Sequence, residues 1–387
     1  MKQEKPDAAQ VSNFDYLLKV MVRKQASDLF VTAGLPPSLK INGQIKPIIP
    51  APLSEDEARA IIHSVMNDEQ RAEFDRTHEC NFAISREGIG RFRVSAFQQK
   101  QKTGMVLRKI ETVIPTVEQL NLPPILNELV MAKRGMILLV GGTGTGKSTT
   151  LAAMLGHRNR NSQGHIVSIE DPIEFVHEHA GCVITQREVG VDTESFEIAL
   201  RNTLRQAPDV ILIGEIRTRE TMEHAITFAE TGHLVLATLH ANNTNQALER
   251  IVNFFPIERR EQVLLDLSLN LKAIIAQQLI PTPDHEGRRA CLEILIKSPY
   301  ISDLIQKGEV YKIKEAIAQS TNFGMQTFDQ ALYDLYTNGE ITYEDALRHA
   351  DSANQLRLMV KLGRNADMSE LETVTESYTL IDPDRGN

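Results

Sequence analysis

The residues of this chain most suited to chemistry lie in a glycine-rich stretch, Gly141-Gly-Thr-Gly-Thr-Gly-Lys-Ser148, between an apolar run and a helical segment. This is the GxxxxGK[ST] pattern in the strand, loop and helix setting that gives it meaning. Glycines let backbone N–H groups surround a β-phosphate, Lys147 reaches the β- and γ-phosphates, and the Ser148 hydroxyl ligates Mg²⁺. We therefore expect ATP and Mg²⁺ as cofactors, and a glycine-rich turn that binds nothing is the disfavoured alternative. The predicted nucleotide-binding residues are Gly141, Gly142, Thr143, Gly144, Thr145, Gly146, Lys147, Ser148 and Thr149.

Two acidic residues follow apolar runs and could supply the carboxylates that ATP hydrolysis needs. Glu215 follows the run at 210–213 and is the predicted general base. Because Gly214 stands where an acid is usual, we expect Glu215 to contact Mg²⁺ through water. Glu170 follows the run at 165–169, where it could order Mg²⁺ or water. Clustered acids are more often a solvated turn, but the end of a core strand favours the catalytic interpretation.

Two histidines bracket a further apolar run at residues 234–239, His233 before it and His240 after it. If this run is a strand parallel to the others, His240 lies at the catalytic edge. There it could sense the nucleotide state by hydrogen bonding, without a change of protonation. A lone histidine is usually structural, so that alternative stays open.

Arginines could supply the positive charge that stabilises the γ-phosphate at the transition state, an effect worth roughly 10³ to 10⁵ in rate. Arg91, Arg93 and Arg108 lie on strands predicted for the N-terminal part. Arg187 and Arg205 lie between the two acidic segments, where a neighbouring subunit could meet them. For each of these, an ordinary surface arginine is at least as good an interpretation.

The composition narrows the class of protein. A chain of 387 residues with 42% hydrophobic and 24% charged residues favours two globular domains with tails. A net charge of −9 disfavours a continuous basic face for nucleic acid. Cys80, Cys182 and Cys291 have no CxxC spacing, so we expect neither disulfides nor zinc and a reducing cytoplasm. Residues 1–10 are polar and the apolar runs are short, so membrane association should need a partner.

The pattern of the first part of the chain predicts a small mixed domain. Ser54 and Glu57 form a capping-box signature at a helix start, and Asn42-Gly43 predicts a hairpin turn. The expected helices cover residues 13–21 and 54–66, and the expected strands cover 28–32, 38–41, 45–49, 80–84, 90–98 and 104–110.

Beyond a boundary near residues 112–123, the pattern changes to apolar runs that alternate with helical segments. This alternation is typical of a parallel sheet covered on both faces. The expected strands are 136–140, 165–169, 210–213 and 234–239, and the expected helices include 125–133, 264–279 and the segments after Pro299. The segment at the end of the chain is acidic and has no apolar periodicity, which predicts a flexible tail.

Four blocks in this order resemble the secretion ATPase superfamily of type II and type IV secretion and type IV pili: GGTGTGKSTT, SIEDPIEFVH, PDVILIGEIR and TGHLVLATLHANN. Within that superfamily, DLFVTAGLPPSLKINGQI, GRFRVSAFQQ, QREVGVDTESFEIALRNTLRQAPD and MQTFDQALYDLY are similar to the pilus retraction ATPases of the PilT and PilU type. The similarity extends over about residues 13–340.

This resemblance implies the fold class, an α/β protein with a small PAS-like α+β domain, a RecA-like P-loop ATPase domain and a helical C-terminal appendage. The implied domains are 1–12 flexible, 13–112 PAS-like, 113–123 linker, 124–280 RecA-like core, 281–364 helical and 365–387 an acidic flexible tail.

The resemblance also implies roles and partners. Glu170 and Glu215 would be catalytic carboxylates, His233 and His240 would form the His box, and Arg93 and Arg108 would reach the nucleotide. The chain would form a homohexamer in the cytoplasm, recruited to the cytoplasmic face of the inner membrane by a pilus platform protein. A PilT-type retraction ATPase would be a further partner, and no direct nucleic acid is expected.

Three departures from the family pattern matter. The chain has no tetracysteine zinc subdomain, which weakens an assembly-motor interpretation. Thr218 stands where PilT-like proteins commonly have Asp. The helix at 300–307 reads YISDLIQK where PilT-type proteins have AIRNLIRE, so its first Arg and Asn are replaced by Ser302 and Asp303. Together with the acidic extension, this is more similar to the PilU type and suggests an accessory role.

The sequence leaves other functions open. An independent PilT-like retraction motor is one, and a RecA-like nucleic-acid translocase is another, disfavoured by the acidic balance. A nucleotide-dependent interaction protein with little turnover is a third, since binding and hydrolysis share most residues.

Overall fold

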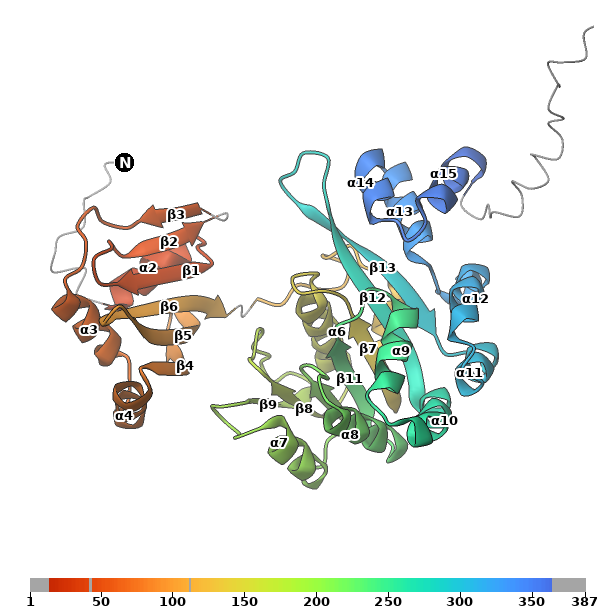
Figure 1. Ribbon diagram of the computed structural model, residues 1–387, viewed down its shortest axis with the longest axis horizontal. Coiled ribbons are helices and arrows are strands. Elements are labelled where there is room, and N and C mark those ends of the chain that lie inside the picture. The colour runs from red at the N-terminus through yellow and green to blue at the C-terminus, as the bar shows by residue number, and fades with distance from the viewer. Residues whose placement is uncertain (1–13, 42–43, 111–112, 364–387) are drawn as a thin grey trace, which may run out of the picture. The chain divides into compact units, whose positions relative to one another are not determined.

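The computed structural model describes residues 14–41, 44–110 and 113–363 of the chain. It divides into two compact units, one built mainly from residues up to Val113 and the other mainly from Ile114 onward (Figure 1). The predicted N-terminal tail, the Asn42-Gly43 turn and the acidic tail at 365–387 lie outside the described residues.

The N-terminal unit is an antiparallel sheet with helices packed on one face. Its strands follow the order β3-β2-β1-β6-β5-β4. On β5, Phe92, Val94 and Ala96 join the buried core, so Arg91 and Arg93, which alternate with them, face the opposite side. The strands are β1 Asp28–Thr32, β2 Ser38–Ile41, β3 Gln44–Pro47, β4 Glu79–Arg86, β5 Gly90–Gln99 and β6 Lys102–Ile110, and the helices are α2 Phe14–Arg23, α3 Glu55–Ser64 and α4 Asp68–Thr77.

Two capping boxes start the helices α3 and α4. The Ser54 hydroxyl accepts from Glu57 N, and Ser54 N donates to the Glu57 carboxylate, as the sequence predicts. Asn67 and Gln70 form the same arrangement before α4, a helix that the apolar pattern did not predict. The signal for α4 was therefore present in the sequence, although its apolar periodicity is weak.

The second unit contains a seven-stranded sheet in the order β13-β12-β7-β11-β10-β8-β9. Its six strands from β12 to β9 pair in parallel, and β13 is antiparallel to β12. The four strands expected from apolar runs are all present, and β9 was missed. The strands are β7 Gly135–Val140, β8 Gly164–Glu170, β9 Cys182–Glu188, β10 Val210–Ile213, β11 Leu234–Leu239, β12 Leu271–Pro281 and β13 Arg288–Ile296.

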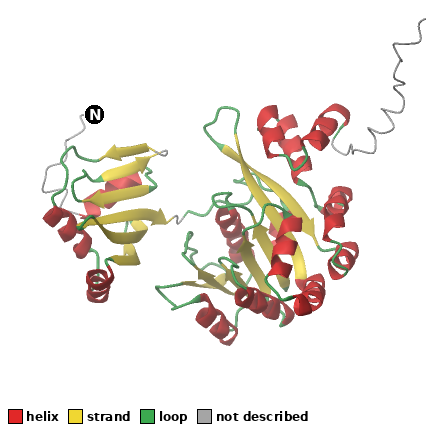
Figure 2. Ribbon diagram, viewed as in Figure 1, coloured by secondary structure: helices red, strands yellow, loops and turns green. Residues whose placement is uncertain are grey.

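Helices cover both faces of this sheet (Figure 2). Met136 and Leu138 of β7 join a core with helices α7 to α10, whereas Ile137 and Leu139 join a separate core with α5 and α6. This explains why β7 and β10 are buried and apolar along their whole length. The helices are α5 Ile125–Val130, α6 Lys147–Asn161, α7 Phe196–Thr203, α8 Arg219–Glu230, α9 Thr244–Asn253 and α10 Arg260–Asn270.

The predicted helix at 264–279 is wrong from Leu271 onward. Helix α10 ends at Asn270, and the next residues form β12, which pairs with β7 and β13. Most of β12 is buried, and a continuous apolar run does not distinguish a buried strand from a buried helix. The range 281–364, predicted to be helical, likewise contains a strand, β13, before its helices.

The C-terminal helices follow β13 and attach to it. Arg289 on β13 forms an ion pair with Glu340 at 2.7 Å, and Gln326 Nε2 donates to Leu292 O at 3.0 Å. Within the described residues, no helix is long and apolar enough to cross a membrane. The helices are α11 Pro299–Gln306, α12 Ile313–Gln319, α13 Phe328–Thr337, α14 Tyr343–His349 and α15 Ala353–Leu362.

Candidate nucleotide-hydrolysis site

The register of the parallel strands brings the predicted catalytic segments to one edge of the sheet. Val140 at the end of β7 pairs with Leu239 at the end of β11. Ile213 of β10 pairs with Ala237 on one side and Ile169 on the other. The residues that follow these strands therefore share the carboxyl edge, where doubly wound sheets bind their ligands.

The glycine-rich loop connects β7 to α6 at this edge. Lys147 Nζ donates to the carbonyl oxygens of Gly141 at 3.0 Å and Gly142 at 2.7 Å, so it spans the loop. Gly146 adopts φ +88°, and a Cβ there would lie 2.8 Å from Gln277 Nε2. A side chain at this position would be strained by the left-handed backbone and would displace Gln277, so the loop conformation requires glycine here.

Gln277 is a supporting residue that the sequence pattern did not reveal. It lies on β12, is 2% exposed, and its Oε1 accepts a hydrogen bond from Thr150 Oγ1 at 2.8 Å. Its backbone oxygen would lie 2.6 Å from a Cβ at Gly141. Gln277 thus contacts both ends of the loop, and it was missed because β12 was assigned to a helix.

Glu215 follows β10 and has a partner for each carboxylate oxygen. One oxygen lies 3.0 Å from His240 Nε2 and the other 2.7 Å from Arg217 Nη2. Its side chain is 19% exposed. His240 therefore lies at the carboxyl edge, where the sequence placed it, and its contact with Glu215 is an addition, as is that of Arg217, which was not among the predicted site residues.

Glu170 lies on the neighbouring strand and is oriented by two side chains. Its Oε1 accepts from Ser168 Oγ at 2.7 Å and from Gln186 Nε2 at 3.1 Å. A Cβ at Gly214 would lie 3.1 Å from Glu170 Cα and 3.2 Å from Ile169 O. The close approach of β8 leaves little room for a side chain at Gly214, and Glu170 lies beside it with a carboxylate.

The donor set at this edge fits Mg²⁺, which prefers oxygen ligands. Ser148 offers a hydroxyl one residue after Lys147, and Glu215 and Glu170 offer carboxylates at adjacent strand ends. Mg²⁺, when bound, would neutralise charge on the β- and γ-phosphates.

Of the remaining candidates in this unit, Arg187 lies at the carboxyl edge, where it pairs with Ile169 near the end of β8, whereas His233 and Arg205 lie away from it. His233 is at the amino end of β11, the end opposite His240, where its Nδ1 lies 3.1 Å from Phe228 O, a structural role. Arg187 Nη2 donates to Asp192 O at 3.1 Å, and Arg205 is exposed in a 3₁₀ turn before β10.

Arg93 and Arg108 belong to the N-terminal unit and are direct cross-strand partners on β5 and β6. Arg108 Nε lies 2.9 Å from Asp28 Oδ1, and its side chain is 63% exposed. The pair therefore presents two guanidinium groups on the face of the sheet opposite the helices.

Thr218, which departs from the family pattern, is the N-cap of α8. Its hydroxyl accepts from Thr221 N at 3.3 Å. Thr and Asp are both favourable N-caps, so the replacement conserves the start of this helix.

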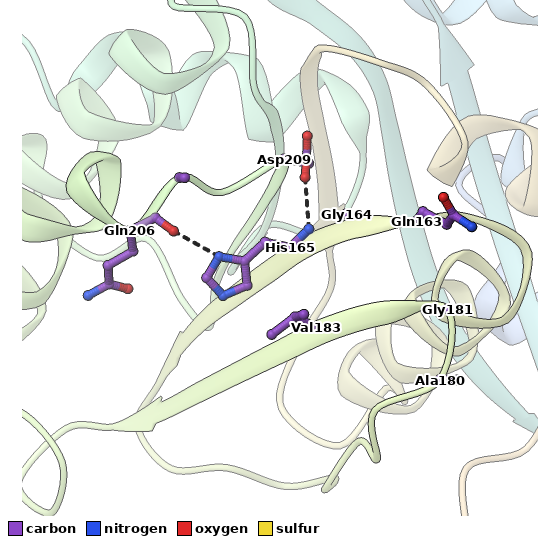
Figure 3. Close-up of a pocket in the computed structure, with 9 residues that line it drawn as sticks. Gln163, Gly164, His165, Ala180, Gly181, Val183, Gln206 and Asp209 are labelled. Atoms are coloured by element: carbon purple, nitrogen blue, oxygen red, sulfur yellow. Dashed lines mark hydrogen bonds between the residues drawn. The ribbon is translucent and has the colours of Figure 1, made fainter.

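A shallow hollow lies at the opposite, amino edge of the sheet, lined by residues of β8, β9 and the turn before β10 (Figure 3). Its two ionisable groups make structural contacts. His165 Nδ1 lies 2.9 Å from Gln206 O, and Asp209 Oδ2 accepts from His165 N at 2.8 Å. The hollow contains none of the predicted catalytic residues, so we do not assign the chemistry to it.

Comparison with known proteins decides the family. The protein-family model described as "Type II/IV secretion system protein" matches residues 3–348 of this chain. This chain belongs to that family. The recognition of a secretion ATPase from the four ordered blocks is therefore confirmed.

Relatives within the family include pilus ATPases. The chain is 64% identical over 95% of its length to the type IV pilus ATPase PilU of Pseudomonas aeruginosa, of which 96% is covered. It is 42% identical over 86% of its length to the type IV pilus retraction ATPase PilT of the same organism, of which 97% is covered.

A solved structure of the pilus retraction motor PilT with bound ADP matches 88% of this chain and 98% of that one, at a TM-score of 0.83 and 39% identity. The predicted fold class, an N-terminal α+β domain and a P-loop ATPase domain with a helical C-terminal region, is confirmed.

Glu215→Gln should slow ATP turnover by at least about 100-fold while ADP affinity stays within about threefold of wild type. The reason is that a neutral amide cannot take a proton from the attacking water. Steady-state hydrolysis and equilibrium nucleotide binding measure the two effects. Weakened binding with an unchanged kcat would contradict the general-base role.

Gly214→Asp should not improve catalysis, although it restores a common acidic position. The new Cβ would press on Glu170 and the end of β8, which should destabilise the fold by about 1–3 kcal/mol and lower kcat. Denaturant unfolding and hydrolysis test this, with Gly287→Ala as a control whose Cβ meets only ordinary contacts from 3.4 Å. A stable, faster Gly214→Asp enzyme would refute the packing argument.

Proposed function

We propose that this chain is a Mg²⁺-dependent, ATP-hydrolysing motor of type IV pilus retraction and twitching motility, and that it works as an accessory to a PilT-type ATPase. The observation that carries this proposal is the 64% identity to a pilus ATPase across nearly the whole of both chains. The arrangement of Lys147, Glu170, Glu215 and His240 at one sheet edge supports the enzymatic part.

The residues of the site suggest how hydrolysis proceeds. Lys147 would exchange the carbonyls of Gly141 and Gly142 for β- and γ-phosphate oxygens. Glu215 would accept a proton from the attacking water once its ion pair with Arg217 loosens, and His240 would orient the carboxylate. In this structure, Arg217 and His240 engage the Glu215 carboxylate. Release of Glu215 from Arg217 would therefore couple nucleotide binding to activation of the base.

Helix α11 supports the accessory role. Ile301, Leu304 and Ile305 are each 1% exposed, so the packing face predicted from the sequence is retained. On the remaining surface, Asp303 forms an ion pair with Lys307 at 2.8 Å, and the buried Ser302 hydroxyl has no hydrogen-bond partner among the described residues. Where the PilT-type motif has Arg and Asn, this helix thus has a buried serine hydroxyl and an aspartate paired with Lys307.

We further propose a homohexamer at the cytoplasmic face of the inner membrane, recruited by the pilus platform protein. In such a ring, Arg93 and Arg108 would supply charge to the γ-phosphate, with Arg187 and Arg205 as alternatives. The exposed Arg108 guanidinium is compatible with this role.

Cells that express only this protein among retraction ATPases should show impaired pilus retraction, and added PilT-type motor should restore it. The altered surface of α11 is the physical reason. Labelled pili imaged in live cells provide the measurement, with a Lys147→Ala version of this chain as the inactive control. Robust retraction by this chain alone would indicate an independent motor.

Rings that mix Arg108→Ala subunits with Glu215→Gln subunits should regain part of the ATP turnover that each variant lacks. Recovery is expected because some contacts would join an intact Arg108 to an intact Glu215 of the neighbouring subunit. Differently tagged subunits establish that the rings are mixed, and a wild-type and Glu215→Gln mixture gives the dilution baseline. If proven mixed rings stay inactive at every ratio, Arg108 does not act across the contact.

A further inference from the structure

A carboxylate outside the catalytic edge is buried in an unusual place. Glu293 lies on β13 and is 1% exposed. Its Oε1 accepts two hydrogen bonds from one residue, from Thr244 N at 2.8 Å and from Thr244 Oγ1 at 2.7 Å. Burial raises the pKa of Glu293. Since a buried carboxyl group is costly to the fold, the position needs an explanation beyond packing.

Thr244 connects this carboxylate to the catalytic edge. It is the first residue of α9, which follows β11 through only four residues, 240–243. The first of these is His240, whose ring lies 3.0 Å from the Glu215 carboxylate. One end of the loop is fixed at β11, where Thr238 Oγ1 donates to Gly214 O at 2.6 Å. Glu293 fixes the other end.

The residues on either side of Glu293 are hydrogen-bonded to the segment before α13, because Gln326 Nε2 donates to Leu292 O at 3.0 Å and Ile294 N donates to Gln326 O at 2.8 Å. Lys314 on α12 bonds Asp351 at 2.9 Å and Asp329 at 3.5 Å, and Asp329 Oδ1 accepts from Asp351 N at 2.9 Å. Burial is the largest cause of the raised pKa of Glu293; the Asp351 carboxylate also raises this pKa, and the Lys314 ammonium lowers it. In the antiparallel pairing of β12 with β13, Glu293 also lies opposite Ala276, the residue before Gln277, whose side chain and backbone lie against the glycine-rich loop.

We propose that Glu293 is a positioning residue that sets the place of His240 beside Glu215 and links that pair to the C-terminal helices through β13. The proposal rests on the proposed ATPase function. A displacement of β13 would move Glu293 and with it Thr244, and the short loop would carry the shift to His240. Misplacement of a catalytic group by about 1 Å can lower a rate by about 100-fold.

The test compares Glu293→Ala, which removes the acceptor, with Glu293→Gln, whose amide oxygen can still accept both bonds. The alanine variant should lose at least about tenfold in kcat with the KM for ATP and the ADP affinity nearly unchanged, and the glutamine variant should recover most of it. Thr244→Val, which removes only the hydroxyl donor, should give a smaller loss. Hydrogen exchange of a peptide covering 240–244 should be faster in Glu293→Ala and near wild type in Glu293→Gln.

Thr342→Ala is the matched control, because it removes the N-cap of α14 in the same C-terminal region without touching the His240 loop. It should lower the thermal midpoint and leave kcat and the 240–244 exchange unchanged. If Glu293→Ala behaves like this control, the positioning role is refuted. If wild type itself shows no turnover, the ATPase function fails, whereas unchanged exchange at 240–244 in Glu293→Ala would separately overturn the inference.

Discussion

Every chemical feature of this protein depends on one constraint, the common direction of the parallel strands β7, β11, β10 and β8. Because these strands run the same way and are in register, the segments that follow them emerge at a single edge. Strand direction and register are therefore enough to bring the phosphate loop, the His240 loop, Glu215 and Glu170 to that edge. Burial of both faces of the sheet, by α5 and α6 on one side and α7 to α10 on the other, holds that edge in place.

A second constraint refines the first, the close approach of β8 to β10. A Cβ at Gly214 would lie 3.1 Å from Glu170 Cα, so a side chain there would require the two strands to shift by a few tenths of an ångström. The site has a carboxylate from the neighbouring strand, Glu170, beside this position. Glycine before Glu215 thus suits the spacing of β8 and β10.

The sequence predicted the parts of the site whose signals are local. The loop glycines, Lys147, and the acidic and histidine residues that end apolar runs could be found because the strands bearing them are short, apolar and bounded. Gln277 and Glu293 could not be found this way. They lie on β12 and β13, and the continuous apolar run of β12 suits a buried helix as well as a buried strand, so their approach to the loops is a property of the tertiary fold alone. The pairing of Arg217 with Glu215 likewise depends on side-chain direction, which no spacing encodes.

In this structure Lys147 bonds to the carbonyls of its own loop, and Glu215 is engaged by Arg217 and His240. We expect both sets of contacts to be exchanged for contacts with nucleotide at the carboxyl edge. An experimental structure with Mg²⁺, ADP and beryllium fluoride tests it most directly. We predict Lys147 Nζ on the β- and γ-position oxygens, Ser148 on the metal, and the Glu215 carboxylate facing the γ-position. Nucleotide bound elsewhere, or Lys147 still on the carbonyls of Gly141 and Gly142 with nucleotide present, would contradict it.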